Sequence, residues 1–326
     1  MINLIFNEMI KISRKRKLLI ISAIVAVLVA MFTYAQFREI QRITERLGTT
    51  DWRAQLQQDI IDAENRLNSS SMSDEYKEYL RTLIDQQKFY LEQNINPQAP
   101  GAPTFIRIFL ENAIDLFIPL LVMVIAADLV SSEASGGTIK LLLTRPVKRS
   151  RILLSKLLAM ILSVSLIVWI VILLSYLISG IVLGYGGWNL PILSGFESVN
   201  GELSTQNVHL IPQWQYILME AGLVWFVAII VGSLTFMLSV IMRSTAAVMG
   251  IILASLISGV ILSNTISSWE SAKYLFMINL RLTDYLRGFA PPIEGMTLGF
   301  SISVLAAWGA TAIFIAFYSF TRKDVY

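Results

Sequence analysis

Six long stretches rich in apolar residues constrain the fold of this chain more than any other feature. They occupy residues 18–35, 105–130, 152–183, 213–242, 245–264 and 296–320. A helix needs about 20 predominantly apolar residues to cross the hydrocarbon core of a bilayer. Helices and closed barrels are the structures that satisfy the backbone there. The sequence therefore predicts an all-α polytopic membrane protein with six transmembrane helices.

The composition agrees with this class and excludes several functions. Hydrophobic residues make up 55% of the 326 residues and charged residues 15%, whereas about a quarter of a globular chain is charged. No cysteine and a single histidine are present, which excludes a disulfide framework, a cysteine metal site and a multi-histidine zinc site. The chain lacks a P-loop motif and a catalytic triad that can be assembled. We therefore expect no enzyme and no cofactor bound by this chain.

Charge placement predicts the orientation in the membrane. The net charge of +3 is small, and the basic residues cluster at the edges of the apolar stretches, which argues against nucleic acid as a partner. The basic flank before residue 18, and the absence of lysine and arginine from residues 184–212, place both termini in the cytoplasm. We expect the chain to lie in a cell membrane, with lipid as a partner. The composition is compatible with a bacterial membrane.

The N-terminal residues 1–17 are predicted to form an interfacial helix on the inner leaflet. The apolar residues on one helical face are Leu4, Ile5, Met9 and Ile12. Basic residues follow that face, as in helices that lie in the membrane surface. A plain basic flank is the alternative. The tail at residues 321–326 follows the sixth span.

Three segments are expected outside the cell. Residues 36–104 contain two stretches with helical apolar spacing around a serine-rich break, which predicts a helical hairpin. That hairpin is either a spacer or a cap that gates the outer mouth or binds substrate. Residues 184–212 form an extracellular loop. Residues 265–295 are predicted to hold re-entrant or interfacial helices, because their apolar run is too short to span.

The cytoplasmic loop at residues 131–151 has an unusual order of residues. Glu133 precedes the glycine pair at 136 and 137, and residues 138–143 form a short helix with an apolar face. Pro146 ends that helix, since proline lacks the N–H that a helix interior needs. A loop that only anchored the topology would need neither the acid nor the leucines. We therefore predict that this loop docks a cytoplasmic partner.

The loop resembles the first cytoplasmic loop of the membrane subunits of type 2 ABC exporters, the ABC transporter permeases. The matching residues are Glu133, Gly137, Thr138, Lys140, Leu142, Pro146 and Arg149, with Lys156 in the next span. The six-span layout and the C-terminal residues from 321 extend the resemblance over most of the chain.

The resemblance implies that residues 131–151 are a coupling loop that docks on an ABC ATP-binding subunit, present in two copies. ATP and Mg would be bound by that separate subunit. Six spans are half of the usual membrane core of such exporters, which implies a second permease copy or a sister permease. The resemblance also implies outer re-entrant helices and a pathway bordered by the second and fifth spans.

Acidic residues in the second span predict a translocation path. Glu111 and Asp115 are four residues apart and share a helix face. Pro119 cannot donate a hydrogen bond to the carbonyl of Asp115, which frees that oxygen. Ionisable groups in spans normally face the bundle interior or a wet cavity. The alternative is structural: an Arg107–Glu111 ladder, with Asp115 held by a neighbouring helix.

Small residues recur every fourth position along the fifth span. They are Ala246, Gly250, Ala254 and Ser258. Small side chains let helices approach closely in a membrane. This face is predicted to be a packing seam, either within the chain or at a dimer interface.

These features together predict the permease subunit of an ATP-driven ABC exporter that forms the translocation path. The alternative is a non-transporting membrane sensor or scaffold that presents the outer hairpin. A secondary transporter ranks third, because no inverted repeat of broken helices is visible. The substrate is not specified by the sequence.

Overall fold

A computed structural model describes residues 1–49, 51–68, 74–138, 147–199, 202–263, 269–289 and 291–322. Within these residues, six segments are long and apolar enough to cross a membrane: Lys17–Arg46, Phe117–Ser135, Arg149–Leu183, Gln213–Ile241, Thr245–Ser263 and Leu298–Arg322. The prediction of a helical, multi-pass protein with six candidate spans is confirmed.

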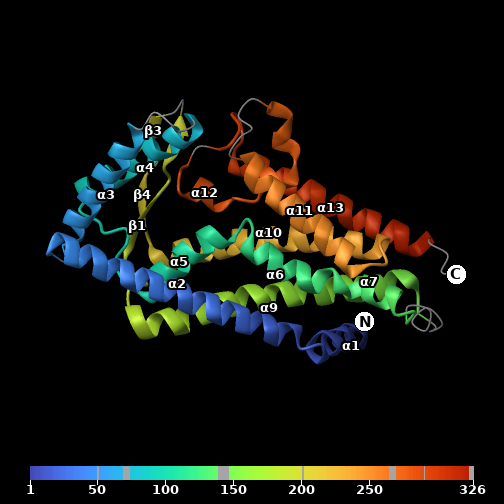
Figure 1. The fold of residues 1–326 in the computed structure, drawn as a ribbon. Coiled ribbons are helices and arrows are strands. Elements are labelled where there is room, and N and C mark those ends of the chain that lie inside the picture. The colour runs from blue at the N-terminus through green and yellow to red at the C-terminus, as the bar shows by residue number, and fades with distance from the viewer. Residues whose placement is uncertain are drawn as a thin grey trace.

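Helix α1, Ile2–Arg14, packs along the side of the bundle, and α2, Lys17–Leu47, runs beside the long helix α9, Arg149–Leu183 (Figure 1). Arg16 adopts a left-handed backbone conformation with φ of 54° at the turn between α1 and α2. The apolar face of α1 packs against the protein, with Ile12 buried; its predicted position on the inner leaflet stays a prediction. Helix α2 continues beyond residue 35, where the first span was expected to end.

The predicted second span, residues 105–130, is divided into three helices: α5 Ala102–Ala113, α6 Phe117–Ala126 and α7 Asp128–Ser135. The break between α5 and α6 falls at residues 114–116, just before the first turn of α6, which contains Pro119. Proline in that turn has no N–H for the carbonyl of Asp115. The break between α5 and α6 therefore contains Asp115, the residue whose carbonyl lacks a partner because of Pro119.

Helix α10, Gln213–Ile241, lies at the centre of the bundle. It packs against α5, α6, α9 and α13, Leu298–Arg322. Its residues Val224, Val227, Ala228, Val231 and Phe236 are fully buried. Helix α11, Thr245–Ser263, lies further out and buries mainly Val248, Ile252 and Leu256.

One end of the bundle, here called the hairpin end, carries α3, Trp52–Leu67, and α4, Asp74–Glu92 (Figure 1). These two helices bury Ile60, Ala63, Leu80 and Ile84 between them. The opposite end, with α1 and α7, is called the α1 end.

Within the described ranges, four short strands depart from the predicted all-α fold. Strand β1, Pro191–Ser194, pairs antiparallel with β4, His209–Pro212, and β2, Glu197–Val199, pairs antiparallel with β3, Glu202–Ser204. All four lie in the segment expected to be an extracellular loop. The predicted re-entrant segment holds the 3₁₀ turns η1, Glu270–Tyr274, and η2, Phe276–Asn279, and the short helix α12, Thr283–Leu286.

Candidate functional site

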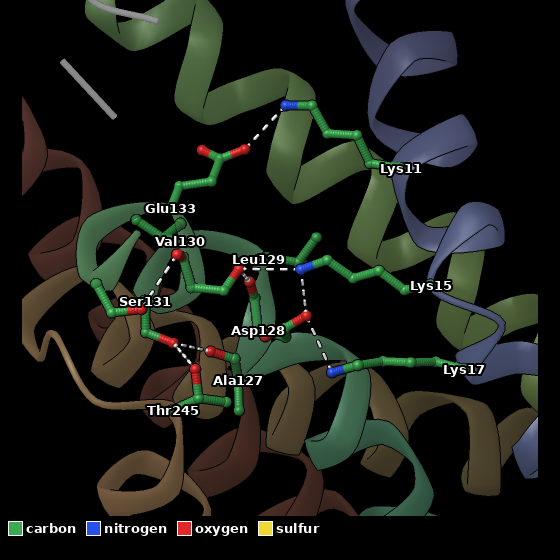
Figure 2. Close-up of polar contacts among 12 residues, drawn as sticks. Lys11, Lys15, Lys17, Ala127, Asp128, Leu129, Val130, Ser131, Glu133 and Thr245 are labelled. Atoms are coloured by element: carbon green, nitrogen blue, oxygen red, sulfur yellow. Dashed lines mark hydrogen bonds and ion pairs between the residues drawn. The ribbon is translucent and has the colours of Figure 1, made fainter. Parts of the chain in front are cut away.

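An ionic network joins three helices at the α1 end. Lys156 on α9 is 1% exposed, and its Nζ lies 2.8 Å from Glu8 Oε2 and 2.8 Å from Glu133 Oε2. The same ammonium donates to the carbonyl oxygen of Leu129 at 2.9 Å. Lys11 Nζ lies 2.8 Å from Glu8 Oε1 and 2.8 Å from Glu133 Oε1; Figure 2 shows the contact with Glu133. Two acids and two bases thus hold α1, α7 and α9 together without net charge.

The ion pairs keep the α1 side of this network charged. Burial by itself raises the pKa of Glu8, but Lys156 and Lys11 outweigh it and hold that pKa below the ordinary value. Burial lowers the pKa of Lys11, yet its hydrogen bonds to Glu133 and Glu8 outweigh burial and leave that pKa raised. Both groups therefore carry their charges at neutral pH.

A second set of ion pairs ties the turn between α1 and α2 to α7. Lys15 Nζ lies 2.6 Å from Asp128 Oδ2, and Lys17 Nζ lies 3.0 Å from the same oxygen (Figure 2). Lys15 also donates to Ser132 Oγ at 3.1 Å, and Lys17 donates to the Val124 carbonyl at 3.1 Å. These groups line a cavity of about 460 Å³ between α1 and α7.

The junction between α6 and α7 is also fastened to the central helix α10. Ser239 Oγ donates to the Ala127 carbonyl at 2.8 Å and accepts from the N–H groups of Val130 and Ser131 at 3.1 and 3.0 Å. Ser131 Oγ lies 2.7 Å from Thr245 Oγ1 at the start of α11 (Figure 2). The α7 segment is therefore fixed to α1, α9, α10 and α11 at once.

The predicted coupling residues divide into two groups. Lys140, Leu142 and Pro146 lie outside the described residues. Glu133 turns toward Lys11 and Lys156, so its carboxylate stabilises the bundle and is not presented to a partner. Helix α7 ends before the glycine pair, and Gly137 has φ of +69°, as expected for a break there. Thr138 Oγ1 donates to the Glu133 carbonyl at 3.4 Å, and Arg149 begins α9.

A second cluster of charges lies at the hairpin end. Glu111, 5% exposed on α5, has Arg107 Nη1 at 3.0 Å and Arg287 Nε at 3.6 Å. Arg107 Nη2 also donates to the Pro97 carbonyl at 2.8 Å. Glu220 of α10 is fully buried beside them. This cluster joins α5 and α10 to the segment that follows α12.

The other predicted path residues lie next to this cluster. Asp115 Oδ2 is 3.3 Å from Arg281 Nε, and the same nitrogen is 3.5 Å from Asp284 Oδ2. Burial raises the pKa of Asp284, and the nearby arginines reduce the effect without cancelling it. Pro119 is buried in the first turn of α6. Glu111 and Asp115 therefore each have an arginine partner from residues 281–287.

Helix α4 and the short strands cover this cluster. Gln86 Nε2 donates to the Arg287 carbonyl, and the Tyr79 ring stacks on Phe289 with ring centres 4.7 Å apart. Tyr90 donates to the Leu193 carbonyl of β1 at 3.5 Å. The hairpin is thus packed onto one end of the spans.

The predicted small-residue face of α11 makes no seam within the chain. Its members, Ala246, Gly250, Ala254 and Ser258, are all exposed. A Cβ added at Gly250 would meet no atom within 4 Å, whereas one at Gly259 would meet Met277 Cβ at 2.7 Å. Close packing of α11 thus occurs at Gly259, one position beyond the predicted set. A dimer contact through the predicted face stays a prediction.

These features define a helical multi-pass membrane protein with buried ion pairs at both ends. The model of the family "Protein of unknown function (DUF2705)" matches residues 77–326, and the chain belongs to that family. The chain is 28% identical over 329 residues to "Uncharacterized protein YhcI" of Bacillus subtilis (strain 168), covering 100% of this chain and 99% of that protein. It is also 28% identical over 215 residues to "Uncharacterized membrane protein YdbK" of the same organism, covering 65% of this chain and 80% of that protein.

The prediction that the chain is a member of the type 2 ABC exporter family is wrong. The family model that matches most of the chain is DUF2705, and neither relative is described as a transporter. The resemblance depended on seven spaced residues in one short loop, on Lys156 in the next span, on the number of spans and on the C-terminal residues from 321. In this structure Glu133 and Lys156 pair with each other across the bundle.

Proposed function

We propose that this chain is the membrane subunit of a transport complex that exports a substrate, driven by a separate ATP-hydrolysing protein in the cytoplasm. In this proposal the chain itself hydrolyses no ATP, and ATP and Mg are held by the partner. Both termini and the α1 end face the cytoplasm of a cell membrane. A second copy or a sister subunit completes the membrane core.

The observation that carries the proposal is the attachment of α7 to the rest of the bundle. The loop at residues 131–151 is the one whose sequence predicts docking of a partner, and its residues 139–146 lie outside the described ones. Its base is fixed to α1 and α9 through the Glu8–Lys11–Glu133–Lys156 network and to α10 through Ser239. A displacement of the loop by a partner is therefore passed to several spans at once.

A buried ionic network suits this role better than a simple topology anchor does. Glu8, Glu133 and Lys156 are held away from water, whereas Lys11 is half exposed, and burying the three charges is unfavourable unless each is paired. Apolar side chains of similar volume would fill the same space at lower cost. Ion pairs, in contrast, fix one relative placement of α1, α7 and α9, which a device that transmits force requires.

Co-purification tests the proposal. A tagged chain is isolated from native membranes in mild detergent, and bound ATPase activity is measured for the parent, L142D and I61D. Leu142 belongs to the predicted docking loop, whereas Ile61 is 48% exposed on α3 at the hairpin end. We expect the parent and I61D to retain the ATPase and L142D to lose it.

Two outcomes contradict the proposal. If no ATPase accompanies the parent chain, a sensor or scaffold that presents α3 and α4 becomes the better explanation. If L142D keeps the ATPase and its activity, the loop is not the docking element.

A further inference from the structure

Glu220 is a buried acidic side chain whose two carboxyl oxygens both lack a hydrogen-bond donor among the described residues. It lies in the third turn of α10 and is fully buried. Its neighbour within hydrogen-bonding reach is the carboxyl of Glu111. Two carboxyl groups can form a hydrogen bond only when one of them holds a proton.

The surrounding charges balance without Glu220. Three arginines of the cluster face three other acids: Arg107 and Arg287 contact Glu111, Arg281 contacts Asp115, and Arg281 and Arg287 both contact Asp284. Each of these acids has at least one arginine within 4.0 Å, and Glu220 has none. An ionised Glu220 would therefore add an unpaired negative charge to a buried site.

The groups that face Glu220 come from α5, α10 and the segment after α12. They are Glu111, Arg107, Arg287 and, one turn earlier on α10, Tyr216. Helix α12 and strand β4 also pack on α10: α12 adds Asp284, which the arginines at 281 and 287 pair, and β4 begins at the exposed His209. Among the other described helices packed on α10, α6 and α11 contain no acid or base, and the charged residues of α7, α9 and α13 lie at the α1 end. An isolated buried carboxylate is strongly disfavoured, and such a group becomes neutral instead.

We propose that Glu220 is a proton-binding site, in which its protonated carboxyl donates a hydrogen bond to the carboxylate of Glu111. Water delivers the proton, and Glu111 accepts the hydrogen bond while Arg107 and Arg287 keep it charged. Helix α4 and the α12 segment cover the site. Release of that proton to water leaves a carboxylate on α10. This inference is independent of the transport proposal.

Infrared spectroscopy of the intact protein in lipid nanodiscs tests the site. At neutral pH an ordinary glutamate is ionised, since its pKa is about 4.3, so only a protonated buried carboxyl gives a carboxylic-acid C=O stretching band. We expect the parent protein to show this band, E220Q to lack it, and E270Q to keep it. Glu270 is an exposed matched control at the start of η1.

Thermal unfolding of the same variants provides a second readout. The glutamine amide of E220Q copies a protonated carboxyl and can donate to Glu111 in the same way. E220Q should therefore melt at the parent temperature. The proposal is overturned if the parent shows no such band, if the band persists in E220Q, or if E220Q fails to fold or melts at a different temperature.

Discussion

The Lys156→Met substitution is the most direct test of the network at the α1 end. Methionine has a similar length but no charge, so the change removes the contacts to Glu8, Glu133 and the Leu129 carbonyl. Both carboxylates are then left with Lys11 alone, while their side chains are only 8% and 13% exposed. Removal of one partner from a buried ion pair typically destabilises a protein by about 3–5 kcal/mol.

The melting temperature of the protein in nanodiscs converts this estimate into a measurement. An unfolding entropy of about 2.1 cal/mol/K per residue gives roughly 0.7 kcal/mol/K for a chain of this length, so K156M should melt about 4–7 °C lower. The control is K88M, because Lys88 makes an ion pair of the same 2.8 Å length with Glu64 in which both side chains are about half exposed. Exposed pairs contribute at most about 1 kcal/mol, so K88M should shift by less than about 2 °C.

A double variant separates the ion pair from the packing of the lysine stem. In K156M the carboxylates of Glu8 and Glu133 share Lys11 as their one cationic partner within the network. Adding E8Q removes one of these two negative charges. The double variant should therefore be more stable than the sum of the two single effects predicts, as for residues in one network. Equal melting shifts for K156M and K88M, or strict additivity with E8Q, would refute the reasoning.

Three further predictions follow from the structure. Because the pKa of Glu8 is lowered in the folded protein, its stabilising effect is complete above the ordinary glutamate value of 4.5 and is lost as the pH falls through the folded pKa; melting curves in acid should show this loss, and E8Q should flatten it. Gly259→Leu should destabilise the single chain by contact with Met277, whereas Gly250→Leu should not, as thermal unfolding will show. Asp115→Asn should reduce substrate-stimulated ATPase activity of the complex while expression and basal hydrolysis stay unchanged; equal stimulation would assign this residue to structure.

The spans were predictable because bilayer thickness sets a length that apolar runs must match. The position of the break in the second span was also contained in the sequence, since Pro119 removes one defined hydrogen bond. The four strands were missed for a physical reason. Each is only three or four residues long, too short for an alternating pattern to stand out, and their pairing depends on contacts between segments.

The contacts within the ionic network could not be predicted from the sequence. Glu8 lies on the apolar face of α1, between Ile5 and Ile12, and an acid in that position signals a buried cationic partner. Its partner, Lys156, is 148 residues away in the chain, and no local pattern connects them. Glu133 and Lys156 were both noted as features of a resemblance, yet their mutual contact depends on how α7 packs on α9.

Helix α10 connects the two charged clusters physically. Nineteen residues separate Glu220 from Ser239, which corresponds to about 28 Å at 1.5 Å per residue, close to the roughly 30 Å hydrocarbon thickness. At one end, Ser239 holds the α6–α7 junction, and at the other end Glu220 lies beside Glu111. Ionisation of Glu220 would place an unpaired buried charge on α10, which is unfavourable. Because α10 is one continuous helix, the proton-binding site and the contact that holds the α6–α7 junction belong to the same rigid element.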